Sequence, residues 1–487
     1  MTWCEGAEFM YGVLLASAEA AHHVGGHEVP GGVTAVFAVL LVAMITSLAL
    51  EEKIHAKKSV IVGVFAGACL VLATALDLLH FGDVTLPDGH TFPMPIYITA
   101  IEWEVITIIL GASLFVEVTS RSGVFTWMAI SLTKKSGGDP WKLLLAYGVL
   151  TVVFSAMLNN VTAMIIIGSL TGVSLAKLQR TDLLLGFLVV EGLLTNVGGL
   201  LTLISSVPNI IVGGIAGIGF VDFFLVAAPY VVIATAVTLW MGRWKFAIGG
   251  LRDEAEREAA AGLVDGFDEN ESVTSAKFFW FSIAALMLFV FFLAGQSKIP
   301  VLSDLGMGFV ALSFAGIVLL AYKHEVDKFY SVVDWDLLAF FAGLFVVINT
   351  MEHAQVLAVI GTGIETLIDT GASLGTALLL VSSAVASSVT DNIPLAAMLA
   401  KILKNHDPAY AANAPYWWSV IFGANLGGNI TPIGSASTVV AMTIIHKNKL
   451  PLSFIGFVKV AVPFALVQIV VAVVYVVGLT WAGVLSG

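Results

Sequence analysis

The stretch NNVT at residues 159–162 interrupts a long apolar run in the first half of the chain. A related stretch, TDNIP at residues 390–394, interrupts a second long apolar run in the other half. Each is followed by a further polar interruption, at 196–209 and at 425–438. Polar breaks at membrane depth are costly, because a backbone freed from a helix finds no water in hydrocarbon and must line a site enclosed by protein. The four breaks therefore predict a binding centre inside a membrane protein.

The composition supports this class of protein. Of the 487 residues, 58% are hydrophobic and only 11% are charged. Apolar runs of about 18 or more residues, the length that a membrane-spanning helix needs, recur from Val33 to Trp481. We therefore expect an all-α polytopic protein surrounded by membrane lipid. The formal net charge of −12 comes largely from one acidic loop, 253–271, so no nucleic acid is expected as a partner.

The first 30 residues leave two interpretations open. Residues 9–18 form a short apolar run next to the small residues of a signal-peptidase site, but no basic segment precedes them. A cleaved signal and a short extra helix both fit this pattern. The two cysteines, Cys4 and Cys69, lie far apart without metal-type spacing, so neither a disulfide framework nor a metal site of that kind is expected. No cofactor is predicted apart from bound sodium ions.

The rest of the chain divides into two similar halves, 31–242 and 277–487, joined by a charged linker, 243–276. In each half we expect about five spanning helices, one re-entrant hairpin and one broken helix. The segments predicted in the first half are 33–50, 59–76, 105–119, an amphipathic helix at 124–132, the hairpin 141–178, the broken helix 183–218 and 221–241. Those predicted in the second half are 278–294, 305–322, 335–350, an amphipathic helix at 356–367, the hairpin 374–403, the broken helix 417–445 and 454–481.

The two halves also correspond residue by residue, which indicates an internal duplication. An offset of 232 positions relates Trp103 to Trp335, Gly111 to Gly343 and Asn160 to Asn392. An offset of 229 positions relates Asn196, Gly198, Gly199, Thr202, Ile204 and Ser206 to Asn425, Gly427, Gly428, Thr431, Ile433 and Ser435. The breaks are therefore predicted to be equivalent parts of two repeats.

Length and charge predict how the repeats cross the membrane. Each hairpin arm is about 14 to 18 residues long and ends in a polar tip, which is short for a full crossing. Hairpins that enter and leave on one side give five crossings per half, and this odd number inverts one half relative to the other. Nineteen Lys and Arg residues then share the side of the loop 53–58, and only Lys298, Lys401 and Lys404 lie opposite. Two full crossings per hairpin run would give the same charge asymmetry, so hairpin depth rests on arm length alone.

The positive-inside rule places the Lys- and Arg-rich side in the cytoplasm. The linker 243–276 is therefore expected in the cytoplasm, with the protein in a bacterial-type inner or plasma membrane.

These features resemble the ion transporter superfamily. The motifs SVPN at 206–209 and GGNITPIG at 427–434 are similar to the branch of NhaD-type sodium/proton antiporters, arsenite permeases and P-protein-like (citrate-transporter-like) permeases, and EEKIH at 51–55 resembles the NhaD-type members. The resemblance implies an elevator-type alternating-access mechanism and a homodimer. Many relatives have Asp at the position of Asn159 and Gly-Asp at the position of Ser205-Ser206. A two-carboxylate ion site is therefore less expected in the first half.

The polar breaks supply suitable ligands. Asn provides amide donors and carbonyl acceptors, Thr and Ser provide hydroxyls, and Gly lets unwound backbone approach an ion closely. Sodium is expected at the hairpin tips and broken helices, because half-helix ends and unwound carbonyls bind it. The predicted ion- or substrate-binding residues are Asn159, Asn160, Thr162, Asn196, Ser205, Ser206, Asn209, Thr390, Asp391, Asn392, Asn425, Asn429, Thr431, Ser435 and Ser437.

Two acids at membrane depth, Asp391 and Glu191, are the candidates for proton coupling, because intramembrane carboxylates are usually functional. The alternative role of Asp391 is a structural hydrogen bond to its own hairpin. The alternative role of Glu191 is a hydrogen bond to a neighbouring helix. The acids that flank the tryptophans at positions 103 and 335 are expected to cap and anchor helices; they are Glu102, Glu104, Asp334 and Asp336.

The sequence ranks sodium/proton antiport first among the functions, because carboxylates and oxygen ligands lie in the predicted core while Lys and Arg are nearly absent from the breaks. The alternative is a proton- or sodium-coupled permease for a small anion or oxyacid such as arsenite, silicate or a carboxylate. An ion channel is a third and less favoured option. An enzyme is not expected, because the sequence shows no nucleophile with its base, metal-ligand set or phosphate-binding loop.

Overall fold

The computed structural model describes residues 29–79, 82–85, 90–158, 160–264, 266–273, 275–323, 326–331, 333–407 and 410–486. The predicted ligand Asn159 and residues 1–28, with their two interpretations, lie outside these ranges. Eleven helices in the described part of the chain are long and apolar enough to span a membrane. The predicted all-α polytopic class is therefore confirmed.

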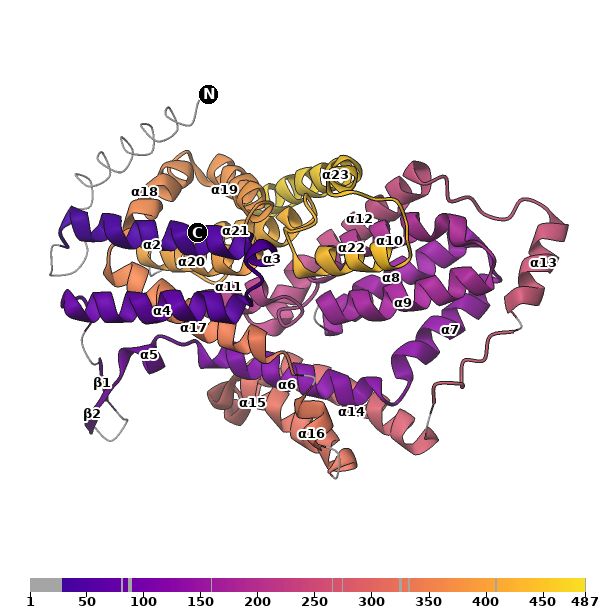
Figure 1. Ribbon diagram of the computed structural model, residues 1–487, viewed down its shortest axis with the longest axis horizontal. Coiled ribbons are helices and arrows are strands. Elements are labelled where there is room, and N and C mark those ends of the chain that lie inside the picture. Colours follow the sequence, from indigo (N-terminus) through magenta and orange to yellow (C-terminus); the bar gives the residue numbers. More distant parts are fainter. Residues whose placement is uncertain are drawn as a thin grey trace.

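The first half follows the predicted order of segments (Figure 1). Its main helices are α2 (Gly31–Ala49), α4 (Lys58–Ala75), α6 (Trp103–Ser120), α7 (Val124–Ser136), α8 (Pro140–Met157), α9 (Asn160–Lys177), α10 (Leu184–Gly198), α11 (Val207–Ala216) and α12 (Phe220–Lys245). Its shorter elements are α3 (Glu51–Ile54), α5 (Ile96–Thr99), the 3-10 turn η1 (Thr181–Leu183) and an antiparallel hairpin of β1 (Gly82–Thr85) and β2 (Thr91–Met94). The hairpin run thus divides into α8 and α9, and the broken helix into α10 and α11.

The second half has the same order. Its main helices are α14 (Ala276–Gly295), α15 (Pro300–Leu319), α17 (Trp335–His353), α18 (Val356–Ile368), α19 (Ala372–Ser387), α20 (Asn392–His406), α21 (Pro415–Gly427), α22 (Ala436–Lys447) and α23 (Phe454–Trp481). Its shorter elements are η2 (Gln296–Lys298), η3 (Leu320–Tyr322) and α16 (Val326–Tyr330). A further helix, α13 (Glu254–Val264), lies in the linker, which the sequence interpretation treated as a loop.

Helices from opposite halves pack together at equivalent positions. The first-half helix α4 packs on α17, and the second-half helix α15 packs on α6 (Figure 1). Helices of opposite halves also pack together around the broken helices, where α9 packs on α22 and α20 packs on α11. At one crossing, a Cβ added to Gly111 would lie 2.5 Å from the carbonyl carbon of Ala311, and at the equivalent crossing Gly343 approaches Val62. Small residues of this kind let membrane helices approach closely.

Acids at the helix starts act only partly as expected. Asp334 caps α17 by accepting a hydrogen bond from the Leu337 amide at 3.0 Å, as predicted. Glu104 instead accepts from the amide of Met307 at 3.0 Å, on the helix that packs against its own. The preceding residue, Gly306, has φ 76° and ψ 171°, so α15 is broken there and its freed amide needs this acceptor. The predicted boundary at 305 marks this break rather than the start of the helix.

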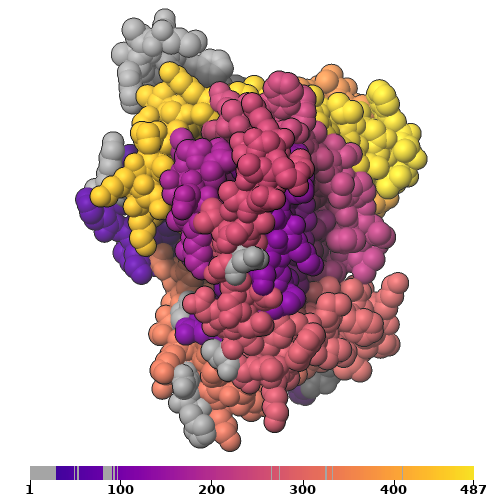
Figure 2. Space-filling view, turned by 90° about the vertical axis from the view of Figure 1, so that its right-hand side faces the viewer, coloured from indigo at the N-terminus to yellow at the C-terminus, as the bar shows by residue number. Residues whose placement is uncertain are grey.

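The linker lies against the first hairpin and its neighbour α7. Glu269 accepts a hydrogen bond from Lys134 Nζ at 2.5 Å, and this bond holds the pKa of the Glu269 carboxyl below its ordinary value. Asp139, at the start of α8, accepts from the Leu251 amide at 3.1 Å. Phe267 is buried under Lys177 at the end of α9. Figure 2 faces this end of the molecule and shows the linker, in rose, lying across the purple helices.

The predicted inversion of one half relative to the other can be tested by cysteine labelling. In a background with Cys4 and Cys69 replaced by serine, a cysteine placed at Gly266 is expected to react with an impermeant maleimide only from the cytoplasm. A cysteine at Asp407 is expected to react only from outside, because an odd number of crossings lies between the two positions. Reaction of both cysteines from one side would contradict the inverted topology.

Candidate functional site

The broken helices end and restart in the middle of the molecule. The chain is unwound from Gly199 to Ser206 and again from Gly428 to Ser435. A helix end leaves carbonyls without intrahelical partners, and side chains from the break satisfy them here. Asn209 Nδ2 donates to the carbonyls of Gly199 at 2.7 Å and of residue 202 at 3.0 Å. In the second break Thr438, which corresponds to Asn209, donates its hydroxyl to the Pro432 carbonyl at 2.9 Å.

Two equivalent hydrogen bonds join the breaks of the two halves. Asn196 Nδ2 donates to Ser435 Oγ at 2.9 Å, and Ser206 Oγ donates to Asn425 Oδ1 at 2.7 Å. Asn196 corresponds to Asn425 and Ser206 to Ser435, so the same pair of residues is in contact twice, with the donor and acceptor roles exchanged. All four side chains are buried. The repeated contact agrees with the residue correspondence predicted from the sequence.

Further bonds extend this network on both sides. Asn196 Nδ2 also donates to Asn429 Oδ1 at 2.8 Å, and Asn425 Nδ2 donates to Asn209 Oδ1 at 2.9 Å. Asn196 Oδ1 accepts from Ser437 Oγ at 3.1 Å. The amide of Asn429 donates to Gln468 Oε1 on α23 at 2.8 Å. These bonds form two groups, one around Asn196 and one around Asn425. We call their residues together the central network: Asn160, Asn196, Asn429, Ser435 and Ser437 in the first group and Ser206, Asn209 and Asn425 in the second.

Each hairpin tip contacts the break of its own half. Asn160 Nδ2 donates to Asn196 Oδ1 at 3.4 Å, and a Cβ added to Gly199 would lie 2.7 Å from Asn160 Nδ2. Ser155 donates to the carbonyl of residue 195 at 2.6 Å, and its counterpart Ser387 donates to that of residue 424 at 2.6 Å. The paired contacts show that both hairpins dock on their broken helices in the same way.

The remaining predicted ligands lie beside the network or face elsewhere. Thr431 donates to the Ser388 carbonyl at 2.6 Å, Ser205 to the Gly199 carbonyl at 2.6 Å and Thr390 to the Ala386 carbonyl at 2.8 Å. These three hydroxyls hold backbone near the tips. Asn392 begins α20 and is buried, and Thr162 lies in the first turn of α9.

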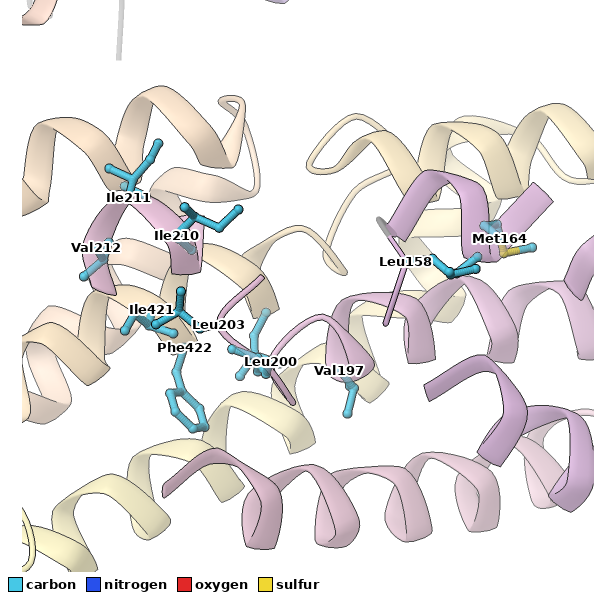
Figure 3. Close-up of a cluster of buried hydrophobic side chains, with 14 of the residues drawn as sticks. Leu158, Met164, Val197, Leu200, Leu203, Ile210, Ile211, Val212, Ile421 and Phe422 are labelled. Carbon is cyan, nitrogen blue, oxygen red and sulfur yellow. The ribbon is translucent and has the colours of Figure 1, made fainter. Parts of the chain in front are cut away.

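Apolar side chains surround the central network. Figure 3 shows part of this wall, formed by Leu158 at the first hairpin tip, Val197, Leu200 and Leu203 at the first break, and Phe422 on α21. Every residue of α21 is buried. Hydrogen bonds are electrostatically stronger where such packing excludes water, and an unpaired polar group there is correspondingly costly.

Asp391 is held apart from the network by an ion pair. Its carboxylate lies 2.7 Å from Lys58 Nζ at the start of α4, and it also caps α20 by accepting from the Ile393 amide at 3.1 Å. The structural hydrogen bond considered as the alternative role of Asp391 is therefore present. Sequence reasoning missed Lys58 as a site residue. A lysine at the start of a span is visible in the sequence, but the contact joins positions 333 residues apart and no local pattern reveals it.

A cleft of about 590 Å³ lies next to this ion pair. Its lining combines acids, basic residues and the first residue of α22: Glu51, His55, Ala56, Lys57, Lys58, Asp334, Asp336, Leu337, Phe340 and Ala436. Ala436 follows Ser435, which belongs to the central network. The cleft therefore reaches from the α3–α4 turn to the edge of the network.

Glu191 lies apart from both features. It is fully buried on α10, and its Oε1 accepts a hydrogen bond from Thr171 Oγ1 on α9 at 2.6 Å. The hydrogen bond to a neighbouring helix that the sequence analysis considered is thus present.

Comparisons with known proteins agree with this architecture. A family model described as "Citrate transporter" matches residues 41–423. A 46 kDa membrane protein of Mycobacterium leprae is 31% identical over 384 residues, covering 77% of this chain and 86% of its own. An uncharacterized transporter of Synechocystis is 25% identical and covers 91% of this chain and 97% of its own. The human P protein is 25% identical over 450 residues, covering 77% of this chain and 53% of its own.

A solved structure shares the fold. The Alcanivorax borkumensis YdaH transporter aligns with a TM-score of 0.53 at 14% identity, covering 88% of this chain and 99% of its own. These matches confirm the resemblance to the branch with P-protein-like and citrate-transporter-like permeases. Together with the membrane-spanning helices, they identify the chain as an integral membrane transporter.

Proposed function

Because this chain belongs to the citrate transporter family, we propose that it is a secondary active transporter that moves a small anion or oxyacid together with a proton or sodium ion. The observation that carries this proposal is the convergence of helix ends of both polarities on the central network. The helices α9, α11 and α22 begin there, and α8, α10 and α21 end there. The second hairpin tip, between α19 and α20, lies beside the network, where Thr431 donates to the Ser388 carbonyl. Helix N-termini attract anions and C-termini attract cations, so both ions have a place in one centre.

The side chains of the network suit a neutral or anionic solute. Its members are Asn and Ser residues, whose amide and hydroxyl hydrogens can bind the oxygens of a carboxylate or an oxyacid. Among the described residues of the network, none is acidic or basic. The solute would enter through the cleft beside Lys58 and exchange the internal bonds of Asn196 and Asn425 for bonds to itself.

The coupling cation would bind close to Asp391. The lysine ammonium now compensates the Asp391 charge, and a proton or a sodium ion on Asp391 would release Lys58. Sodium sites at the hairpin tips and broken helices remain part of this proposal. Lys58 belongs to α4 and Asp391 to the hairpin tip. Cation binding at Asp391 would therefore break a contact between these two parts.

Transport would follow an elevator-type mechanism. The hairpins and broken helices would move as one body against the pairs α4–α17 and α6–α15, with α7 and α18 as the connecting arms. This division is supported by packing, since α7 contacts α8 and α9, and α18 contacts α19 and α20. By resemblance we further propose a homodimer in a bacterial inner or plasma membrane, with the linker in the cytoplasm.

Sodium/proton antiport is the second candidate. Acids at the cleft, Glu51, Asp334 and Asp336, favour it because they would concentrate cations there. The Lys58 contact favours the anion instead, because it places a cation at the tip that the sequence interpretation took to be acidic alone.

The test is transport by the purified chain in sealed proteoliposomes, with pH and sodium gradients imposed separately and a panel of carboxylates and oxyacids supplied. We expect uptake of at least one solute that requires one of the gradients. Sodium-driven proton movement without any solute would favour the antiporter, and conductance that persists without a gradient of the coupling ion would favour a channel. Empty liposomes provide the baseline.

A further inference from the structure

We propose that Glu191 and the hydroxyls beside it form a proton-binding site inside the first hairpin bundle, separate from the central network, which is loaded and emptied in each transport cycle. This inference rests on the proposed coupled transport. It assigns the coupling proton to a second place, distinct from the Asp391 tip.

The surroundings of Glu191 suit a carboxyl group that exchanges a proton. The side chain has 0% exposure, and among the described residues Thr171 provides its one hydrogen bond, to Oε1. Oε2 is buried and has no hydrogen-bond partner within the described part of the chain. An ionised carboxylate with so little compensation is costly to bury, whereas a carboxylic acid is neutral. Protonation and deprotonation of Glu191 would therefore strongly change the free energy of the folded helices around it.

Three hydrogen-bonded hydroxyls begin one helical turn away from this site, toward the end of α9. Ser174 lies one turn beyond Thr171 on α9, and its Oγ is 2.7 Å from the Tyr147 hydroxyl. The Tyr147 hydroxyl is in turn 2.8 Å from Thr133 Oγ1 on α7. Hydroxyls both donate and accept hydrogen bonds, so such a string can pass a proton. It leads to the end of α7, where Lys134 meets the linker.

The second half shows whether an acid at the position of Glu191 is needed to hold these helices together. Its counterparts of Tyr147, Thr171 and Glu191, by the offsets of 232 and 229, are Leu379, Leu403 and Val420. All three are buried and apolar. The same bundle of hairpin and broken helix is therefore built without a carboxyl or a hydroxyl at these positions. Glu191 is not required to hold the fold together, and a function accounts for it better.

Tyr147 on α8 is the titratable group of the packed helices that lies near enough to Glu191 to sense its charge. Tyr230 on α12 donates its hydroxyl to the Gln468 carbonyl, and α22 approaches α10 with Ala441. The other titratable or charged side chains on these elements lie toward their ends: Lys142 on α8, Lys177 on α9, Asp182 on η1, Asp222, Arg243 and Lys245 on α12, Tyr416 on α21, and His446 and Lys447 on α22. A pH response of the bundle would thus come from Glu191.

The test compares Glu191→Gln with Glu191→Val in the full chain. Gln keeps the size and the acceptor for Thr171, and Val copies the second half, so both variants are expected to fold. Glu258→Gln, which removes an exposed acid from α13 in the linker, is the matched control. In proteoliposomes we expect both Glu191 variants to lose pH-driven solute uptake. They should keep solute exchange between equal concentrations at equal pH, which needs no net proton movement.

Infrared difference spectra recorded between two pH values provide a readout besides transport. We expect a buried-carboxyl band that is absent from Glu191→Gln and present in Glu258→Gln. Unchanged pH-driven uptake in both Glu191 variants would overturn the inference, as would loss of exchange together with uptake in a folded Glu191→Gln protein. If the unsubstituted chain shows no coupled uptake but its band titrates and disappears in Glu191→Gln, the proposed function fails while the proton site stands.

Discussion

Replacing Asn196 with alanine is expected to reduce solute uptake by about 10- to 100-fold. The side chain is fully buried and connects the first hairpin tip, through Asn160, to Ser435 and Asn429 of the other half. Its loss leaves Asn429 Oδ1 without the donor that it has now, and a stranded buried acceptor costs about 1–3 kcal/mol. Alanine also removes the amide that we propose bonds to the solute, and each 1.4 kcal/mol lost from solute binding lowers the affinity about tenfold.

Initial uptake rates in proteoliposomes and thermal unfolding in detergent measure this effect. Asn448→Ala is the matched control, because Asn448 is exposed at the end of α22 and bonds only to its own helix in the described structure. We expect the control to keep both uptake and stability. Uptake by Asn196→Ala at the unsubstituted rate would show that the central network is not the binding site.

Replacing Asp391 with asparagine is expected to abolish or strongly alter the pH dependence of transport while the protein stays folded. Asparagine keeps the shape and can still cap α20, but it removes the negative charge that lies 2.7 Å from Lys58 Nζ. Lys58 is then a partly buried ammonium without this partner, since only 31% of its side chain is exposed. Substitutions at two residues in contact usually show an interaction energy of about 0.5–3 kcal/mol.

A double-mutant cycle of Asp391→Asn and Lys58→Gln measures that energy from melting curves and uptake rates. We expect the double variant to be less impaired in stability than the sum of the single variants. Asp334→Asn is the control, because it removes an acid from the same cleft and still allows a cap on α17. Additive effects, or pH dependence unchanged in Asp391→Asn, would remove Asp391 from the coupling mechanism and leave proton coupling to Glu191 or to the solute.

Local sequence patterns predicted the helical architecture well. The final span was placed at 454–481, where α23 lies, and the breaks at 159–160 and 391–392 separate α8 from α9 and α19 from α20. These features depend on runs of apolar residues and on the polar residues that interrupt them, which are read within a window of about 20 positions. The pairing of Asn196 with Asn425 across the offset of 229 also follows from comparing the halves. These features can be found in the sequence without knowing which helices contact one another.

The contacts that bring distant segments together were not predictable in this way. Lys58 meets Asp391, and Glu104 meets the broken start of α15, only because α4 and α6 each pack on a helix of the other half. The short elements α13 and the β1–β2 hairpin were missed because they lack an apolar run of membrane length. The asymmetric position of Glu191 becomes informative only when its apolar counterpart, Val420, is known to be buried in an equivalent place.

The packing of first-half helices on second-half helices affects how the protein is made. When the ribosome has produced the chain up to α12, the helices α4, α6, α9 and α11 all lack the second-half partners that they have in the mature protein. At that stage the amides of Asn196 and the hydroxyl of Ser206 have no acceptors from the second half. The half-made chain therefore exposes polar surface that must be shielded at the insertion machinery, because contacts so distant in sequence form late. A fragment that stops in the linker is expected to be degraded, and neither half should be stable when produced alone.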